Sequence, residues 1–372
     1  MHRFPEDWSK LRVALVHDWL TGMRGGERVL ELLCDGFPSA PLYTLIHNKG
    51  AISDSINRHT ITASPLQKMP GIFRRYRYFL PLFPAAIATM RPPAGDLLIS
   101  TSHCAAKGLK PGPGMKHLCY CFTPMRYAWT FYDEYFGSNP VKKILLKPTL
   151  AALRSWDRAA SARVDRFVAI SRHVQDRIRS AYGREADVVY PPVNTEFYTP
   201  APAETARPPF DLIVSALVPY KRLDLAIAAY NQLGFPLKIV GSGTERDKLQ
   251  AGAGKNIEFL GWQPDGVIRD LYRGCRLLVF PGEEDFGIVP VEAQACGKPV
   301  VAFNRGGVTE SIIANQTGTF FDEPTTASMI AAVEEAAATS WDAIAIRRNA
   351  ERFSVQVFLD GLDASIQQCL KG

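Results

Sequence analysis

Glu284 and Glu292 lie eight positions apart, on either side of a break in an apolar part of the chain. RLLVFP is a predicted strand, GEEDFG the loop after it and IVPVEAQACG the next helix, with Glu292 about one turn inside it. Each carboxylate can accept two hydrogen bonds, which suits the paired hydroxyl groups of a sugar. The backbone N–H groups around Phe286, Gly287 and Ile288 face the helix start, where a phosphate can bind. An acidic turn that only caps a helix explains the isolated segment about equally well.

Two adjacent cations, Lys221 and Arg222, follow the predicted strand FDLIVSAL. Cations at the carboxyl end of a strand can neutralise a diphosphate leaving group. A solvated charge pair is the simpler explanation, but cations at the start of a helix oppose its dipole. We therefore expect an anionic group near this pair.

Two glycine loops also follow predicted strands. Gly25 and Gly26 lie between the first strand and its helix, and Gly241 and Gly243 lie in IVGSGTE. Exposed backbone N–H groups in such loops can hold a diphosphate, although a glycine pair alone is usually only a turn. The dinucleotide fingerprint G-x-G-x-x-G is absent, which counts against a dehydrogenase.

Strands and helices alternate along the whole chain. The strand-like runs are LRVALVH, PLYTLIH, DLLISTS, HLCYCFT, RFVAIS, FDLIVSAL, PLKIVG, NIEFLG, RLLVFP and KPVVAF, and helical patterns such as RHVQDRIRSAYG, RLDLAIAAYNQL and VTESIIAN separate many of them. This alternation predicts parallel sheets covered by helices on both faces. Ligands bind such sheets at the carboxyl ends of the strands, where every motif above falls.

A proline-rich stretch divides the chain, with six prolines in the 21 residues of YPPVNTEFYTPAPAETARPPF. We predict an α/β fold of two doubly wound domains, 1–190 and 211–352, joined by a linker over 191–210. We also predict a cleft between the domains. A helix over 353–372 is expected to pack back toward the first domain.

Composition excludes several classes of protein. The chain of 372 residues is 47% hydrophobic, enough for one large or two medium cores. Seven cysteines without a C-x2-C pair indicate a reduced compartment rather than a zinc site. The start, MHRFPEDWSK, does not read as a signal peptide, and no apolar run reaches the roughly 18 residues of a membrane-spanning helix.

Charge is unevenly distributed between the two halves. Residues 1–200 carry 27 Lys and Arg against 16 Asp and Glu, whereas residues 201–372 carry 16 against 21. Most of the excess lies in residues 51–150, with 13 basic against 4 acidic side chains. We therefore expect the first half to face an anionic partner such as lipid head groups, a phosphorylated acceptor or nucleic acid.

The stretch EEDFGIVPVEAQACGKPVVAFNRGGVTESI resembles the donor-site signature of glycosyltransferase family 4, whose members are retaining enzymes of the GT-B fold. HDWLTGMRGGERVLE, SALVPYKRLDLAI and VAISRHVQDRIRSAYG with VVYPPVN resemble three further segments of the family, in the expected order. The resemblance covers nearly the whole chain. It implies an acceptor-binding first domain and a nucleotide-sugar-binding second domain, both Rossmann-like, facing each other across a cleft.

The resemblance also assigns roles to the donor-site residues. It implies that Glu292 holds ribose hydroxyls, that Glu284 holds the transferred sugar, and that Lys221 and Arg222 stabilise the departing diphosphate. No D-x-D motif is present, so the cations are expected to replace a metal, and no cofactor is expected. Many relatives have an arginine where this chain has Ala216, which puts the donor geometry in doubt.

On the acceptor side, the resemblance places His103, after DLLISTS, near the transferred sugar, whereas a lone histidine is more often structural. The stretch CYCFTPMRYAWTFYDEY (119–135) is similar to the acceptor loop of the family, with Phe122 where many relatives have histidine. Arg126 is a candidate for binding an acceptor phosphate. Tyr127 and Trp129 can stack on a sugar face, and core packing explains them equally well.

The segment IFRRYRYFLPLFPAAIATM (72–90) combines Arg74, Arg75 and Arg77 with aromatic and aliphatic side chains. It resembles the membrane-docking segment of the family. Basic residues near anionic lipid contribute about 1 kcal/mol each, which gives weak and reversible docking. A buried loop with a basic edge is the alternative, and no nucleic-acid module supports RNA binding.

The motif combination most resembles bacterial mannosyltransferases of surface-polysaccharide or O-antigen (lipopolysaccharide) assembly. It implies transfer of mannose from GDP-mannose to a lipid-linked oligosaccharide by a peripheral enzyme on the cytoplasmic face of the inner membrane. A UDP-sugar donor is the first alternative. A nucleotide-sugar epimerase, a phosphorylase or a non-catalytic sugar-nucleotide-binding member is the second.

Overall fold

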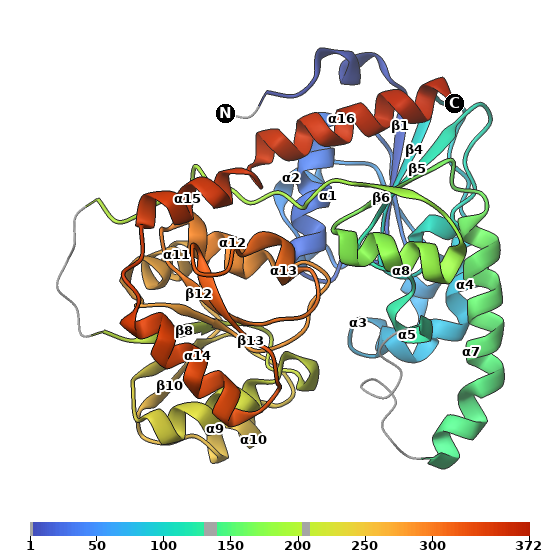
Figure 1. Cartoon of the computed structure of the whole chain (residues 1–372). Coiled ribbons are helices and arrows are strands. Elements are labelled where there is room, and N and C mark those ends of the chain that lie inside the picture. The colour runs from blue at the N-terminus through green and yellow to red at the C-terminus, as the bar shows by residue number, and fades with distance from the viewer. Residues whose placement is uncertain (1–2, 130–139, 203–208) are drawn as a thin grey trace. The chain divides into compact units, whose positions relative to one another are not determined.

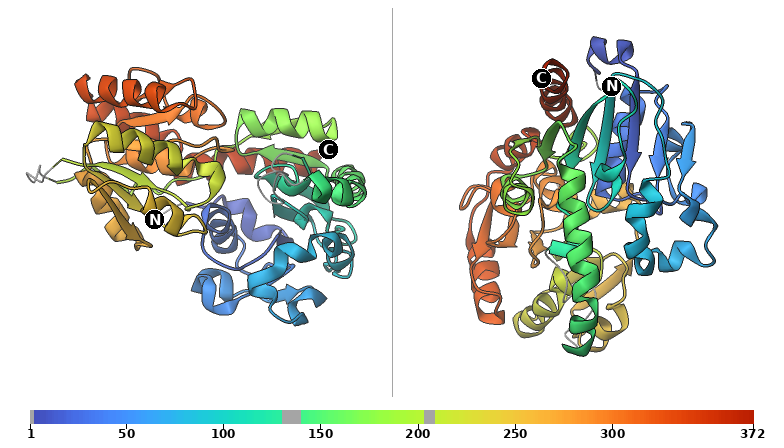
Figure 2. Two further views of the ribbon diagram at one scale, coloured as in Figure 1. Left: turned by 90° about the horizontal axis from the view of Figure 1, so that it is seen from below. Right: turned by 90° about the vertical axis from the view of Figure 1, so that its right-hand side faces the viewer.

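The computed structural model describes residues 3–129, 140–202 and 209–372, with the backbone alone for 140–146. The chain forms two compact units (Figure 1), which we call the first unit, Met1–Tyr190 with Phe358–Gly372, and the second unit, Pro191–Val357. Each unit is built on a parallel sheet with helices on both of its faces (Figure 2). The predicted α/β fold of two helix-covered parallel sheets is therefore confirmed.

Within the described residues, the sheet of the first unit has seven strands in the order β3-β2-β1-β4-β5-β6-β7. Every pairing in it is parallel. Its central strands are buried along almost their whole length, because helices cover both faces. The bounds are β1 Val13–His17, β2 Leu42–Thr44, β3 Ile61–Ala63, β4 Leu97–Ser102, β5 Lys116–Cys121, β6 Arg166–Ala169 and β7 Ala186–Val188.

The helices of the first unit follow the strands in the alternation that the sequence predicts. Their bounds are α1 Gly25–Gly36, α2 Asp54–Asn57, α3 Ile72–Arg75, α4 Phe83–Ile87, α5 Arg126–Trp129, α7 Pro140–Ser161 and α8 Arg172–Tyr182, with short 3-10 turns that include η3 Pro65–Lys68, η4 Tyr76–Leu82 and η5 Ala106–Gly108. Capping residues set the ends of α8, for example. Ser171 caps α8 by accepting the N–H of Val174, and Gly183, with φ of 64°, ends it.

The last helix, α16 (Val355–Lys371), belongs for most of its length to the first unit. Asp363 accepts a hydrogen bond of 2.8 Å from the indole Nε1 of Trp8, which is buried near the N-terminus. Phe358 packs edge-on against Tyr120 of β5, with ring centroids 5.6 Å apart. These contacts hold the C-terminal helix on the sheet of the first unit.

In the part of the chain that the structure describes, the second unit has a sheet of six strands in the order β10-β9-β8-β11-β12-β13. All of its pairings are parallel. Its strands are β8 Asp211–Val214, β9 Leu237–Val240, β10 Ile257–Gly261, β11 Leu278–Phe280, β12 Val300–Phe303 and β13 Gly318–Phe321. The carboxyl ends of β8 and β11, which precede the predicted donor residues, therefore lie side by side at one edge of the sheet.

Helices enclose this second sheet, with bounds α9 Leu223–Leu233, α10 Arg246–Ala251, α11 Asp265–Gly274, α12 Ile288–Ala295, α13 Val308–Ser311, α14 Thr326–Ala338 and α15 Ala343–Glu351, and the 3-10 turn η6 Pro219–Lys221. Ile213 and Val279 of the sheet share a core with Tyr230 of α9 and Met329 of α14. On the other side of β8, α11 packs against this strand and against α12. The helix α11 thereby links the end of β10 to the helix that carries Glu292.

Some predicted elements differ in the structure. The short strands β3, β7 and β13 were missed, because each has only three or four residues, too few for a clear strand pattern. VTESIIAN forms only the single turn of α13. The segment 72–90 forms three short helical pieces, α3, η4 and α4.

The predicted linker, 191–210, is only partly a linker. Its beginning packs within the second unit, where Val193 donates its N–H to Phe353 O over 2.8 Å. Arg347 of α15 donates to the backbone carbonyls of Thr195 and Tyr198. Proline content alone did not indicate this packing, because it depends on residues about 150 positions later. Residues 203–208 of the predicted linker lie outside the described residues.

Candidate active site

Lys221 and Glu284 form an ion pair between Nζ and Oε1 at the carboxyl edge of the second sheet. Lys221 ends the 3-10 turn η6 after β8, and Glu284 lies on the loop after β11. Their side chains are 13% and 25% exposed, so the pair is largely shielded but still reachable from solvent. A cation and a carboxylate that the sequence indicated separately therefore lie together at this edge.

Closely packed glycines hold this pair in position. A Cβ at Gly282 would lie 2.8 Å from the Lys221 Cα, and one at Gly306 would lie 2.4 Å from the Glu284 carbonyl oxygen. Gly306 has φ of 77°, and the N–H of Gly307 donates to Glu284 O over 2.8 Å. The loops after β8, β11 and β12 therefore meet backbone to backbone around Lys221 and Glu284.

Glu292 lies in the fifth position of α12 and accepts a hydrogen bond of 2.8 Å from the phenol of Tyr272 in α11. Tyr272 is fully buried, and burial raises the pKa of its phenol well above the usual value. The phenol therefore keeps its proton at neutral pH and acts as a fixed donor. This fixes one edge of the Glu292 carboxylate beside α11.

The start of α12 is part of the hydrophobic core as well as a predicted phosphate site. Phe286 is 2% exposed, and its ring packs against Phe353 with centroids 5.5 Å apart. Gly287, with φ of 88°, precedes the helix, which begins at Ile288. Binding of a phosphate by the backbone here stays a prediction, and the Phe286 side chain contributes by fixing the helix start.

Arg222 and its neighbour Lys221 pair with different carboxylates. Arg222 has a left-handed backbone, with φ of 53°, and precedes α9. Its Nε lies 3.2 Å from Asp224 Oδ1, and its side chain is 40% exposed. The predicted cation pair is thus divided, with Lys221 on Glu284 and Arg222 on Asp224.

Gly241 and Gly243 allow two loops to touch. A Cβ at Gly241 would lie 1.9 Å from Ser215 O, and one at Gly243 would lie 2.2 Å from Leu217 O. The N–H of Leu217 donates to Ser242 O over 3.0 Å. These glycines are needed for the packing of the loops after β8 and β9, and their contact with a donor stays a prediction.

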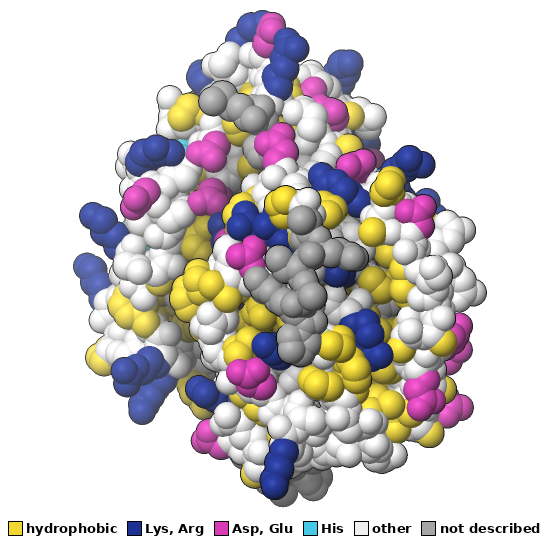
Figure 3. Space-filling model, turned by 90° about the vertical axis from the view of Figure 1, so that its left-hand side faces the viewer, with side chains coloured by type: hydrophobic (Ala, Val, Ile, Leu, Met, Phe, Trp, Pro, Cys, Tyr) yellow, Lys and Arg dark blue, Asp and Glu magenta, His cyan; other side chains and the backbone are white. Residues whose placement is uncertain are grey.

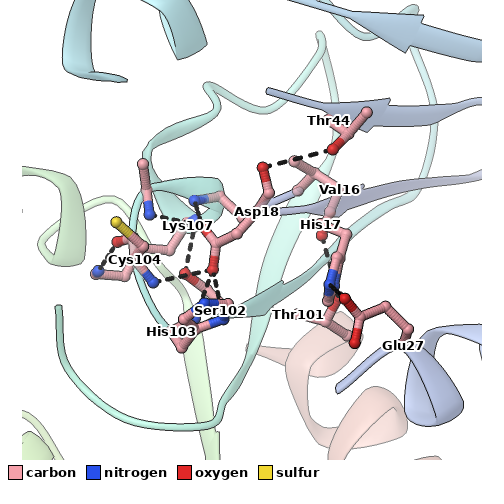
Figure 4. A network of polar contacts seen from close by, with 12 residues as sticks. Val16, His17, Asp18, Glu27, Thr44, Thr101, Ser102, His103, Cys104 and Lys107 are labelled. Carbon is pink, nitrogen blue, oxygen red and sulfur yellow. Dashed lines mark hydrogen bonds and ion pairs between the residues drawn. The ribbon is translucent and has the colours of Figure 1, made fainter. Parts of the chain in front are cut away.

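In the first unit, Asp18 organises the loop that carries His103 (Figure 4). The Asp18 carboxylate is fully buried and accepts the backbone N–H groups of four successive residues, 103–106, over 2.6 to 2.9 Å. His103 Nδ1 lies 3.1 Å from Asp18 Oδ2, and the His103 ring meets Trp19 edge-on at 4.5 Å. His103 therefore has a fixed ring orientation with its side chain 26% exposed.

Figure 4 shows a second polar cluster beside the first, formed by His17, Thr101 and Glu27. His17 Nδ1 lies 2.7 Å from Thr101 Oγ1, and His17 Nε2 lies 4.0 Å from Glu27 Oε1. Burial lowers the pKa of His17 to about 4 and raises the pKa of Glu27 to about 7. Both shifts favour the neutral form of the side chain, because burial keeps water from the charged form.

The glycine pair of the first unit lies directly beside this cluster. Gly25 is the first residue of α1, and Glu27 accepts the N–H of Arg24 over 3.1 Å, which closes the helix start. A Cβ at Gly26 would lie 3.3 Å from the ring of Phe122. Phe122 therefore packs over the helix start, and the binding of a diphosphate by Gly25 and Gly26 stays a prediction.

The aromatic residues of the predicted acceptor loop pack inside the first unit. Tyr127 is 5% exposed and lies in the same core cluster as Trp19. Trp129 Nε1 donates to Asp157 over 2.9 Å, and the guanidinium of Arg158 lies 4.9 Å from the Trp129 ring centroid. These contacts favour core packing, the alternative that the sequence left open.

Arg126 begins α5, and its N–H donates to His103 O over 3.4 Å. The backbone of this candidate acceptor residue is therefore joined to the loop that Asp18 organises. Its binding of a phosphate stays a prediction. Residues 130–135 of the predicted acceptor loop lie outside the described residues.

The predicted basic segment, 72–90, has exposed side chains, and with Lys68 and Met69 just before it we call them the basic apolar patch. It consists of four cations and four large apolar side chains, all exposed: Lys68, Met69, Phe73, Arg74, Arg75, Arg77, Tyr78 and Leu82. The sequence has no Asp or Glu between Asp54 and Asp96. By contrast, the face of the molecule in Figure 3 intersperses basic and acidic side chains.

A comparison with protein families matches residues 195–353 to the family described as "Glycosyl transferases group 1". The match contains Lys221, Glu284 and Glu292. This part of the chain is therefore similar to the group 1 glycosyltransferases.

Curated relatives match a similar share of the chain. An uncharacterized glycosyltransferase of Methanocaldococcus jannaschii is 31% identical over 181 residues, 47% of this chain and 50% of that protein. A D-inositol 3-phosphate glycosyltransferase of Rhodococcus opacus is 30% identical over 248 residues, 58% of this chain and 56% of that protein. The matches span about half the length of these relatives.

Solved structures match nearly the whole chain at low identity. Anabaena HepE in complex with UDP-glucose has a TM-score of 0.69 and 18% identity, covering 96% of this chain and 100% of that one. The lipopolysaccharide outer core galactosyltransferase WaaB has a TM-score of 0.69 and 16% identity, covering 96% and 99%. At these identities the likeness shows the fold alone, which is that of the GT-B glycosyltransferases.

In the group 1 segment, the sequence indicated Lys221, Glu284 and Glu292 but missed the residues that fix them. Tyr272 gave no signal, because an interior helix tyrosine is ordinary. The dipeptide Gly306-Gly307 was a signal, since two glycines after a predicted strand often mark a close backbone approach. In the first unit, Asp18 was missed although it directly follows His17 at the end of the first strand.

All seven cysteines of the chain are buried and unpaired by disulfides. In residues 3–129, 140–202 and 209–372, no three His, Cys, Asp or Glu side chains gather as possible metal ligands. Over the same ranges, no helix combines the length and the apolar character that crossing a bilayer requires.

Proposed function

We propose that this protein is a retaining glycosyltransferase that transfers a hexose from a nucleotide-diphosphate sugar to a carbohydrate acceptor. The observation that carries the proposal is the Lys221–Glu284 ion pair at the carboxyl edge of a group 1 sheet. A cation there suits a diphosphate, and a carboxylate beside it suits the hydroxyl groups of the attached sugar.

Each residue of the second unit then has a distinct task. Lys221 Nζ binds the diphosphate and stabilises the negative charge that grows as it departs. Glu284 orients the hexose through its hydroxyl groups, and Glu292, held by Tyr272, accepts hydrogen bonds from the ribose. Arg222 is a weaker candidate for the diphosphate, because it must leave Asp224 to reach it.

The reaction proposed is a substitution on one face of the sugar. The bond between the anomeric carbon and the phosphate oxygen breaks, and a bond from the acceptor oxygen forms on the same face. The acceptor proton passes to the leaving phosphate oxygen, so that the products are a nucleoside diphosphate and the glycosylated acceptor. His103 is proposed to contact the transferred sugar, with its ring held by Asp18.

For the donor, two nucleotide sugars have support. The motifs resemble those of mannosyltransferases, which favours GDP-mannose. The structural neighbour HepE was solved with UDP-glucose, which favours a UDP-linked sugar. The Rhodococcus relative is named for D-inositol 3-phosphate, which adds a phosphorylated acceptor to the lipid-linked oligosaccharide that we propose.

The basic apolar patch supports docking on an anionic membrane. Exposed rings and aliphatic chains can enter the lipid interface while the neighbouring cations bind head groups. We therefore place the protein on the cytoplasmic face of the inner membrane, where a lipid-linked saccharide is accessible. This placement is part of the proposal.

Isothermal titration with GDP, GDP-mannose, UDP and UDP-glucose, in buffer with EDTA, tests the donor site. We expect micromolar binding of one nucleotide pair without added metal. Binding that needs a divalent cation would overturn the metal-independent mechanism. Binding without turnover on any acceptor would favour a non-catalytic sugar-nucleotide protein, and no binding at all would contradict the proposed function.

A further inference from the structure

Lys107 and Asp157 form a fully buried ion pair in the first unit. Lys107 Nζ lies 2.5 Å from Asp157 Oδ1, and neither side chain has any exposed surface. Burial alone would lower the pKa of Lys107, but the carboxylate beside it holds the pKa above its usual value. Lys107 therefore keeps its charge at neutral pH. No step of the proposed transfer uses this pair.

An ion pair without access to water is a costly way to stabilise a fold. Desolvation of the two charges offsets most of their attraction, and an apolar pair of similar volume often stabilises a protein equally well. An apolar pair cannot form hydrogen bonds, however. The hydrogen bonds that Lys107 and Asp157 make to three neighbouring elements therefore distinguish the pair from ordinary core packing.

On the lysine side, the pair holds the loop after β4, which also carries His103. Lys107 Nζ donates to the carbonyl of Cys104 over 2.9 Å (Figure 4). Asp18 holds the same loop through the backbone N–H groups of residues 103–106. A buried cation and a buried anion thus fix the carbonyl and amide groups of one short turn.

On the carboxylate side, Asp157 joins three helices. Its Oδ2 accepts a hydrogen bond from Trp129 Nε1 over 2.9 Å and another from the Tyr182 hydroxyl over 2.7 Å. Trp129 ends α5 and Tyr182 ends α8, whereas Asp157 itself lies on α7. Arg154 of α7 adds a further bond to α5, from its Nε to Ala128 O over 2.7 Å. The helix α7 accordingly packs against α5, α8 and η5.

These contacts close a ring between the His103 loop and α5. The start of α5 is joined to this loop by the N–H of Arg126, which donates to His103 O over 3.4 Å. The end of α5 is joined to the same loop through Trp129, Asp157 and Lys107. The helix therefore cannot shift against His103 without breaking a buried polar contact.

We propose that Lys107 and Asp157 are positioning residues for the acceptor, which hold α5 in a fixed place relative to His103. The inference rests on the proposed function, because it takes His103 as a contact of the transferred sugar and Arg126 of α5 as a contact of the acceptor. Both members of the pair are fully buried, so they act through the loop and the helix that they join. Binding of a nucleoside diphosphate in the second unit should not depend on them.

Hydrogen–deuterium exchange of the whole protein tests the ring of contacts without any ligand. Lys107→Met with Asp157→Asn removes both charges and leaves no unpaired ion in the core, so this double variant should fold. We expect amide exchange in residues 103–108 and 126–129 to be about tenfold faster than in the wild type.

Arg166→Met with Asp187→Asn is the matched control for the exchange experiment. It removes a half-buried ion pair of the same unit, at the amino end of β6. Exchange in the His103 loop and α5 should stay at the wild-type rate in this control. Wild-type exchange in Lys107→Met with Asp157→Asn as well would overturn the proposal.

Stability and turnover, measured together, separate positioning from a merely structural role. Lys107→Met and Asp157→Asn alone each leave a buried group without its partner and should lower the urea midpoint, and the double variant should recover most of that loss. A structural role predicts that transfer recovers with stability. We expect instead that kcat of the double variant stays about ten- to a hundredfold below that of the wild type.

D-inositol 3-phosphate and octyl mannoside are the probe acceptors for this turnover, and the affinity for GDP and UDP should be unchanged. Recovery of transfer together with stability would overturn the positioning role while leaving the proposed function intact. If the wild type bound neither nucleotide, the proposed function would fail, and the positioning of an acceptor would fail with it.

Discussion

Asp18 Oδ2 lies 3.1 Å from His103 Nδ1, and the same carboxylate accepts four successive backbone N–H groups from residues 103–106. One buried side chain therefore sets both the path of the loop and the orientation of the ring. Because an ionised carboxylate only accepts hydrogen bonds, it matches a set of donors that no amide can match.

The first prediction concerns Asp18→Asn. The new NH2 group would face backbone N–H donors, so at least one buried hydrogen bond is lost and a donor–donor contact replaces it. We expect the free energy of unfolding to fall by about 2 to 4 kcal/mol, together with a loss of transfer activity. Urea denaturation of the whole chain measures the first effect.

His103→Gln is the matched control for Asp18→Asn, because it changes the ring but leaves the loop anchor intact. It should lose activity with little change in stability. If Asp18→Asn were as stable as the wild type, the carboxylate would not be the anchor of this loop.

The second prediction concerns Lys221. Replacing it by alanine removes the cation that stabilises the leaving diphosphate, so kcat should fall by at least about 10²-fold. Lys248→Ala is the control, because Lys248 is an exposed cation of the same unit, 77% exposed and paired with Glu245. Turnover is measured once the donor is known, and near-normal turnover of Lys221→Ala would remove the main claim of the mechanism.

The third prediction separates the cost of a left-handed backbone from the cost of close packing against Glu284. Gly306→Ala places a Cβ at 2.4 Å from the Glu284 carbonyl oxygen, whereas Gly234, with φ of 67°, has nothing within 4 Å. Gly234→Ala should therefore cost only the roughly 1 kcal/mol of a left-handed backbone. Gly306→Ala should cost more and also reduce activity, because Glu284 must move.

Stability and donor titrations of both variants test this third prediction. An equal cost for the two substitutions would show that the loop after β12 yields freely. In that case Gly306 and Gly307 do not position Glu284.

The fourth prediction is a pH dependence of stability in the first unit. The pKa of Glu27 is raised from 4.5 to about 7 by burial, so its contribution is present at low pH and is lost as pH rises toward 7. The pKa of His17 is lowered from 6.5 to about 4, so its contribution grows as pH rises from 4 to 6.5. Between pH 4.5 and 6.5 the two slopes oppose each other.

In Glu27→Gln, the pH dependence of stability that comes from His17 should no longer be offset. Urea denaturation between pH 4.5 and 6.5 should then show stability rising by about 1 kcal/mol per pH unit, against a flatter wild-type profile. The same profile in both proteins would show that Glu27 is not the group that offsets His17.

Much of the fold and part of the site followed from the sequence, because strand–helix alternation and loop motifs are local. The apolar runs located the central strands, and the loop motifs located Lys221, Glu284 and Glu292 at strand ends. What the sequence missed depends on distant contacts. Asp18 acts on a loop 85 residues later, and Tyr272 acts on a helix 20 residues later. No local pattern marks such partners.

Side-chain direction was the other missing information. Tyr127 and Trp129 have the composition of a sugar platform, and only the packing of Trp129 on Asp157 and Arg158 shows how they are used. Trp262 shows the reverse case. It lies in GWQPDG, which reads as an ordinary turn, and its 75% exposure is visible only in the structure.

The fifth prediction concerns the basic apolar patch and anionic membranes. The triple variant of Arg74, Arg75 and Arg77 to serine should lose most binding to vesicles of phosphatidylglycerol and phosphatidylcholine, since each cation contributes about 1 kcal/mol. Phe73→Ser with Leu82→Ser should weaken binding even at high salt, because the apolar contribution is not screened.

Vesicle cosedimentation at low and high salt measures both variants, and donor titration in solution is the matching control. Nucleotide affinity should be unchanged, because the patch lies in the first unit and the donor residues lie in the second. Wild-type protein that stays in solution with anionic vesicles would contradict membrane docking. Equal binding to neutral and anionic vesicles would show that the arginines do not recognise head-group charge.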